Sequence, residues 1–202
     1  MKNATKHAEN LKSLVKKLLK EAKPDPKQVI DPVRALVSGI LTFDTTDARC
    51  AEAWKVIDRE FVDLNELRVA TELEVIDLIG TKYPQIDHRA VMLRETLNGI
   101  FEKEHTLSLD RLKTLGRKEA RAMLRELPEM TPYVEGYTTL FGLDEAAIPV
   151  DKTMLDYLIY QDCLEPETSL EDAQKFLESQ FKVDEHYEAF FVIRRAALKR
   201  HK

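Results

Sequence analysis

The stretch from Leu127 to Asp151 reads LPEMTPYVEGYTTLFGLDEAAIPVD, and it predicts two helices joined by short turns. Thr131 can accept a hydrogen bond from the first turn of a helix, and Pro132 then stands at the first helical position, where its missing N–H costs nothing. After Gly142 a short loop leads to Asp151, which is well placed to cap the next helix. The order helix, turn, helix, loop and aspartate is the clearest structural signal in the chain.

The rest of the sequence also predicts helices. Apolar residues recur at helical spacing along most of the chain, and no segment alternates β-branched residues over the length of a strand. Prolines, glycines and capping residues separate these segments at short intervals, and Thr71 begins a capping box that Glu74 completes. We therefore predict an all-α fold of about ten helices.

Residues 1–27 differ from the rest of the chain in charge. They hold eight lysines against three carboxylates, a net charge of +5, and because the whole chain carries −5, residues 28–202 carry −10. Residues 4–22 have the pattern of an amphipathic helix, which the KPDP sequence at 23–26 ends. We predict a basic N-terminal helix and linker over residues 1–27 and one helical domain over residues 28–202. The helix either packs on the domain or serves as a basic arm for phosphate or a partner.

Composition and cysteine count exclude several classes of protein. The chain is 44% hydrophobic and 33% charged, which is typical of a soluble globular protein, and it has no apolar run of the length that spans a membrane. Two cysteines, Cys50 and Cys163, are too few for a four-cysteine cluster, and the five histidines lack metal-ligand spacing. We expect no metal, no cofactor and no membrane association, and a reducing, cytoplasmic location. The oligomeric state stays open.

Three segments follow one another in an order known from one family. ILTFDTTD at 40–47 is the first, the hairpin stretch at 127–134 together with IPVD at 148–151 is the second, and FKVD at 181–184, which precedes an aromatic helix, is the third. In this order the segments resemble the helix-hairpin-helix DNA glycosylases, the HhH-GPD superfamily of endonuclease III. The resemblance extends over about four fifths of the chain and implies the endonuclease III-like fold, without the iron–sulfur cluster of some members.

The resemblance also implies roles for individual residues. It places Asp151 at the family's catalytic aspartate, where a carboxylate stabilises the cation-like sugar as water hydrolyses the N-glycosidic bond. It places Tyr133 where bifunctional members carry the lysine that cleaves the strand, so an active protein would remove a damaged base and leave the strand intact. Asp44 takes the position that enters the duplex. The hairpin that would bind double-stranded DNA consists of Glu129, Met130, Thr131 and Pro132.

Three residues depart from the family's pattern in a way that weakens DNA binding. Glu129 and Thr131 replace glycines that let backbone N–H groups approach a phosphate closely. Asp44 brings a second negative charge to the same surface. Two functions are therefore compatible with the sequence. One is a monofunctional DNA glycosylase of base excision repair that uses Asp151, and the other is a catalytically degenerate fold that serves as a binding or scaffold module.

Overall fold

The structure is a computed structural model that describes residues 4–200, and in this range it contains eleven α-helices, two short 3-10 helices and no strand. The all-α prediction is confirmed. The elements are α1 (Ala4–Glu21), α2 (Pro32–Thr42), α3 (Asp47–Glu60), α4 (Leu64–Val69), α5 (Glu72–Ile79), α6 (Ile86–Glu104), η1 (Asp110–Thr114), α7 (Arg117–Arg125), α8 (Pro132–Phe141), α9 (Lys152–Tyr160), α10 (Leu170–Gln180), η2 (Val183–Glu185) and α11 (His186–Arg200).

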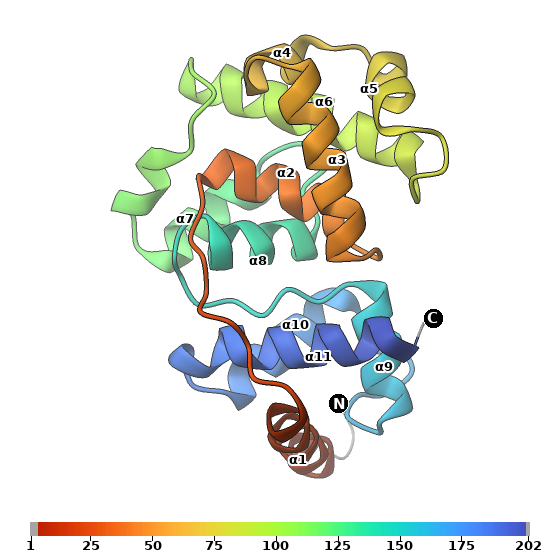
Figure 1. The fold of residues 1–202 in the computed structure, drawn as a ribbon. Helices are drawn as coiled ribbons and strands as arrows, with labels where there is room; N and C mark the ends of the chain where they lie inside the picture. The colour runs from red at the N-terminus through yellow and green to blue at the C-terminus, as the bar shows by residue number, and fades with distance from the viewer. Residues whose placement is uncertain (1–3, 201–202) are drawn as a thin grey trace.

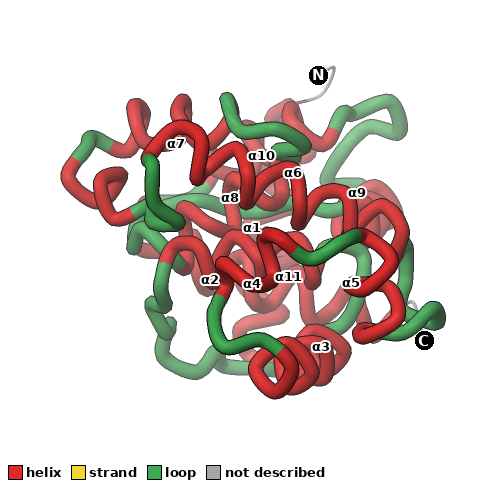
Figure 2. The backbone as a smooth tube through the Cα atoms, turned by 90° about the horizontal axis from the view of Figure 1, so that it is seen from above, coloured by secondary structure: helices red, strands yellow, loops and turns green. Residues whose placement is uncertain are grey.

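The helices form two lobes. Helices α2 to α8 make the upper lobe in Figure 1, and α9 to α11 together with α1 make the lower lobe. The chain crosses between the lobes at residues 22–31 and again at residues 142–151, and the amide of Ile30 donates to the carbonyl oxygen of Phe141 at 2.9 Å where the first crossing meets the end of α8. Figure 2 shows that the connections between helices are mostly short loops.

Helix α2 lies at the centre of the upper lobe. Its sequence is apolar on every side, and all of its residues except Arg34 are buried, as expected of a helix surrounded by others. Its main partner is α8, and Gly39 permits their close approach, because a Cβ atom there would lie 3.3 Å from Cβ of Tyr137. This packing places the C-terminal end of α2 beside the functional site.

Helix α1 packs on α11 in the lower lobe through its apolar stripe, with Leu11 and Val15 buried. Its lysines lie outside that contact, where most of them are exposed. Of the two alternatives for this helix, the structure shows the one in which it packs on the domain. The division of the chain into two parts at residue 27 stays a prediction.

Candidate functional site

Asp151 lies where the loop from α8 enters α9, and it caps that helix as the sequence predicts. Both of its carboxylate oxygens accept hydrogen bonds. Oδ1 accepts from the amide of Met154 at 2.8 Å, and Oδ2 accepts from the amide of Asp44 at 3.0 Å and from Nη1 of Arg194 at 3.0 Å. The residue is only 2% exposed, so the protein encloses the carboxylate.

Arg194 comes from the middle of α11 and is 4% exposed. Besides Asp151, its guanidinium donates to the carbonyl oxygens of Thr42 at 3.0 Å and Thr45 at 2.8 Å. It also donates to Oδ1 of Asp47, from Nε at 3.3 Å and from Nη2 at 3.1 Å. All three nitrogens are engaged, so these bonds hold the guanidinium in one position beside Asp151.

The charges of this pair compensate each other. Burial alone would lower the pKa of Arg194, but Tyr133, Asp47 and Asp151 raise it above its ordinary value, so the guanidinium stays cationic. Burial raises the pKa of Asp151, and the positive charge of Arg194 opposes that rise. Arg194 shares its positive charge between Asp151 and Asp47, and removing it would leave the buried Asp151 carboxylate without a counter-ion.

The C-terminal end of α2 is held by side chains that bind its carbonyl oxygens, which a helix leaves without internal partners. Arg89, a fully buried residue of α6, donates to the carbonyls of Ile40 and Phe43. Tyr83 donates to the carbonyl of Leu41, and Arg194 donates to that of Thr42. These contacts fix the turn that follows α2.

Asp44 lies in this turn and its side chain points to α9. Its backbone has φ of 49°, a left-handed conformation that few residues other than glycine adopt readily. Its Oδ1 accepts from the amide of Thr153 at 2.9 Å, while its own amide donates to Asp151. The two aspartates therefore cap α9 together. The predicted entry of Asp44 into a duplex stays a prediction, and it would require the bond to Thr153 to break.

Tyr133, which is predicted to take the lyase position, lies in the first turn of α8. It is buried, and its hydroxyl donates to Oγ1 of Thr42 at 3.4 Å. The guanidinium carbon of Arg194 lies 5.8 Å from the centre of its ring. Burial raises the pKa of Tyr133 well above its ordinary value, so the phenol stays protonated. A buried neutral phenol cannot form the Schiff base that strand cleavage requires.

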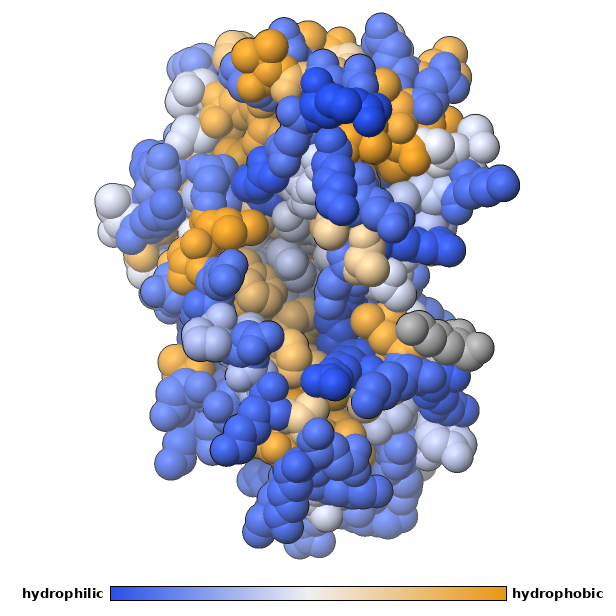
Figure 3. All heavy atoms as spheres, in the orientation of Figure 1, coloured by the Kyte–Doolittle hydropathy of each residue, from blue (hydrophilic) through white to orange (hydrophobic). Residues whose placement is uncertain are grey.

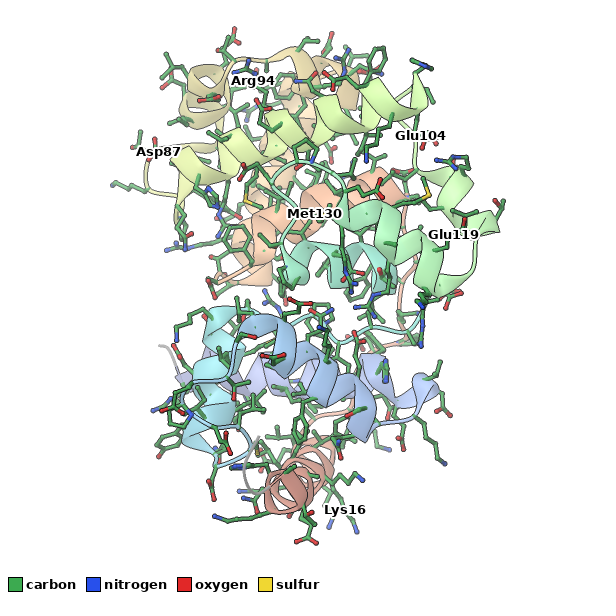
Figure 4. The ribbon with its side chains drawn as sticks, turned by 180° about the vertical axis from the view of Figure 1, so that it is seen from behind. Lys16, Asp87, Arg94, Glu104, Glu119 and Met130 are labelled. Atoms are coloured by element: carbon green, nitrogen blue, oxygen red, sulfur yellow. The ribbon has the colours of Figure 1, made fainter. Side chains whose placement is uncertain are left out.

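The hairpin between α7 and α8 keeps a backbone suited to bind an anion. Glu129 is exposed and has φ of 56°, and Thr131 caps α8 by accepting from the amide of Val134 at 3.2 Å. Within residues 4–200 the amides of residues 129–131 donate to no other protein group. Figure 4 shows Met130 in this loop, beyond the end of α7. Free amides at a helix N-terminus can bind a phosphate, although the Glu129 carboxylate weakens that attraction.

Helix α6 supports the hairpin from behind. Thr96 donates from Oγ1 to the carbonyl of Pro128 at 3.0 Å, and a Cβ atom on Gly99 would lie 2.4 Å from Cδ of Pro128. We expect Gly99→Ala to lower the free energy of unfolding in urea by about 1–3 kcal/mol, because the clash outweighs the helix propensity of alanine. Gly116→Ala is the control, since a Cβ there meets no atom within 4 Å. Equal losses in the two variants would contradict this packing.

A pocket of about 510 Å³ opens between α3, α8 and α11, in the groove between the lobes. The molecular surface is hollowed between the lobes (Figure 3). Arg194 belongs to the pocket lining and Asp151 does not, so the guanidinium lies between the pocket and the carboxylate. The aromatic residues of the lining are Tyr137, Phe141, Tyr187, Phe190 and Phe191.

The sequence analysis did not identify Arg194 as part of the site. One signal could have indicated it: the arginine stands among the apolar residues of the last helix, and Phe190, one turn earlier on the same face, is buried. A cation on a buried face needs a partner. The partner itself, Asp151, lies 43 residues earlier, and no local rule connects the two positions.

Comparisons with known proteins support the same fold. No protein-family model and no curated protein sequence matches the chain. The structure of Clostridium acetobutylicum 8-oxoguanine glycosylase/lyase with double-stranded DNA matches with a TM-score of 0.74 at 18% identity, over 98% of this chain and 71% of that one. The chain has the helix-hairpin-helix glycosylase fold.

Two further structures match this glycosylase-fold chain across most of its length. A trapped endonuclease III–DNA covalent intermediate matches with a TM-score of 0.68 at 13% identity, over 92% of this chain and 84% of that one. Helicobacter pylori 3-methyladenine DNA glycosylase bound to 1,N6-ethenoadenine matches with a TM-score of 0.64 at 16% identity, over 98% of both chains. Two of these neighbours are named for different bases, 8-oxoguanine and 3-methyladenine, so the fold alone does not define a lesion.

The described residues add two findings on the environment of the site. Between residues 4 and 200, no three His, Cys, Asp or Glu side chains gather in a way that could hold a metal ion. No helix in that range is both long and apolar enough to cross a membrane.

Proposed function

We propose that this chain recognises an extruded base in double-stranded DNA and does not hydrolyse its N-glycosidic bond. The observation that carries the proposal is the ion pair between Asp151 and Arg194. As the glycosidic bond breaks the sugar becomes cationic, and a carboxylate already paired with a cation stabilises it less than a free carboxylate does. Here Arg194 bonds the carboxylate and would repel the developing cation.

Displacing Arg194 from this position would be costly. Its guanidinium makes five hydrogen bonds, to two carboxylates and two carbonyl oxygens, and the Arg194 side chain itself is buried. Breaking a buried ion pair costs about 3–5 kcal/mol, which would be added to the barrier of the reaction. The geometry therefore favours a structural role for Asp151.

Two features support DNA recognition. The hairpin presents free amides that can bind a backbone phosphate, and the pocket offers several aromatic faces within the groove between the lobes. Stacking a base on an aromatic side chain contributes about 1–3 kcal/mol. That contribution is comparable to the few kcal/mol that extrusion of a mismatched or damaged base costs.

The test combines binding with base release on the same duplexes. We expect the protein to bind a duplex that holds 2-aminopurine in a mismatched pair more tightly than a fully matched duplex. The fluorescence of 2-aminopurine should rise as this base leaves the stack. Phe191→Ala should reduce this preference, because Phe191 lines the pocket. The logarithm of the DNA affinity should fall linearly with the logarithm of the salt concentration, with a slope of about −0.9 for each phosphate contacted. Equal affinity for both duplexes would contradict base recognition.

Base release decides between this proposal and the second candidate, a monofunctional glycosylase of base excision repair. Asp151 lies at the start of α9 and bonds to Arg194, which lines the pocket, and this position favours that candidate. Duplexes with uracil, alkylated or oxidised bases are incubated with excess wild-type protein or Asp151→Asn. We expect no release above the protein-free rate. Release by the wild type that Asp151→Asn abolishes would establish the glycosylase.

A further inference from the structure

The end of the molecule formed by α1 carries unpaired positive charge around an apolar floor. A groove of about 740 Å³ lies between α1 and the segment from α10 to α11, and we call it the basic groove. Lys12, Lys16 and Lys20 form one row on α1, since they stand one turn apart. In the part of the chain that the structure describes, the lysines paired with carboxylates are others: Lys6, Lys27, Lys103, Lys113, Lys152 and Lys175.

The floor and the second side of the groove are mixed in character. Val15, Leu19 and Phe181 supply apolar surface, while Glu185 and Glu188 supply carboxylates on the side of η2 and α11. Four lysines against these two carboxylates leave the lining net positive, and a DNA backbone has no apolar groups to cover the floor. The groove fits a protein surface that is mostly acidic and carries protruding apolar side chains.

The opposite end of the molecule has such a surface. Residues 60–79, which include α4 and α5, hold six carboxylates against one arginine, and we call them the acidic cap. Figure 1 shows α4 and α5 at one end of the molecule and α1 at the other. Three apolar side chains of the cap are unusually exposed: Val62 at 89%, Leu73 at 73% and Val69 at 67%.

Four carboxylates of the cap lie around one of these exposed side chains, Val69. A shallow hollow of about 550 Å³ is lined by Glu60, Glu66, Glu74 and Asp77 together with Val69. Asp77 forms no salt bridge within residues 4–200, so its charge is free to attract a cation.

We propose that the acidic cap of one copy docks into the basic groove of a second copy. The lysine row then faces the carboxylates of the cap, and the exposed apolar side chains of the cap meet the apolar floor of the groove. The two surfaces differ and lie at opposite ends, so the contact is head-to-tail and extends into open chains of molecules. Figure 4 labels Lys16 on α1 and Met130 in the hairpin, and the two lie far apart. A second copy bound at the basic groove would therefore leave the hairpin uncovered. This association is independent of the proposed function.

Charge reversal at each surface gives a sharp test by sedimentation velocity. For the wild type at about 0.05 M salt we expect a sedimentation coefficient that rises with protein concentration, and a loss of this rise at about 0.5 M salt, where charges are screened. Lys16→Glu and Asp77→Lys should each be monomeric. An equal mixture of the two should associate again, because one variant keeps its cap and the other keeps its groove. Lys118→Glu, an exposed lysine of α7, is the control and should behave as the wild type.

Other outcomes overturn the proposal. A wild type that stays monomeric at low salt over the whole concentration range would exclude the contact. Variants that associate as the wild type does, or a mixture that stays monomeric, would show that the two surfaces do not meet. All three substitution sites are at the surface, and matching circular dichroism melting curves would show that each variant is folded.

Discussion

Replacing Arg194 by alanine is expected to lower the free energy of unfolding by about 3–5 kcal/mol, among the largest losses for a single side chain in this protein. The substitution leaves Asp151 buried without a counter-ion and removes the donor to the carbonyl oxygens of Thr42 and Thr45. Urea unfolding of both proteins measures the loss. Arg195→Ala is the matched control, because this neighbour is exposed and should change stability by no more than about 0.5 kcal/mol.

The loss in the Arg194 variant should depend on pH. Burial already raises the pKa of Asp151 in the folded protein, and without the guanidinium that opposes it the pKa rises further. A group whose pKa is raised on folding favours the folded state below its unfolded pKa of about 3.9, and that contribution is lost as pH rises through the folded value. The loss in the free energy of unfolding relative to the wild type should therefore become smaller as the pH falls from 7 to about 4. A deficit independent of pH would contradict a buried, unpaired Asp151.

Replacing Arg89 by lysine is expected to cost about 3 kcal/mol or more, although the charge is kept. Arg89 is fully buried and donates to three carbonyl oxygens, those of Ile40, Phe43 and Pro84. Burial lowers the pKa of Arg89, and it has no salt bridge within residues 4–200. A single ammonium cannot reach three carbonyls placed for a planar guanidinium, and each buried acceptor left unpaired costs about 1–3 kcal/mol.

The Arg89 variant should also loosen the turn that carries Asp44. Hydrogen exchange of the Asp44 amide, which donates to Asp151, should become faster relative to the global unfolding rate. Arg94→Ala is the control, because Arg94 lies on the surface of the same helix and its pair with Glu72 is worth at most about 1 kcal/mol. If the two variants lost similar stability, Arg89 would not be holding the end of α2.

Local chemistry made much of the fold predictable. Thr131 and Asp151 cap the helices that the sequence assigned to them, and Thr71 with Glu74 forms the capping box. These motifs act within one helical turn, so neighbouring residues are enough to identify them. The order of elements then led to the glycosylase fold, which the structural matches share.

The state of the site could not be predicted in the same way. The sequence around Asp151 is the same whether its carboxylate faces a pocket or an arginine. The contact with Arg194 on the last helix decides between these two states of the carboxylate. Entry of Asp44 into a duplex stays a prediction, and no sequence pattern indicates that its carboxylate accepts from the amide of Thr153, more than a hundred residues later. Such contacts depend on how the helices pack, and no sequence spacing encodes them.

The most direct test of the ion pair on which the proposed function rests is a double-mutant cycle of Asp151→Asn and Arg194→Met. Asparagine keeps the cap of α9 but removes the charge, and methionine fills the space of the guanidinium stem. The free energies of unfolding of the wild type, both single variants and the double variant give the coupling. We expect a coupling of about 2–3 kcal/mol, with the double variant more stable than the sum of the single losses implies. Additive losses would show that Arg194 does not neutralise Asp151, and would leave the carboxylate free for catalysis.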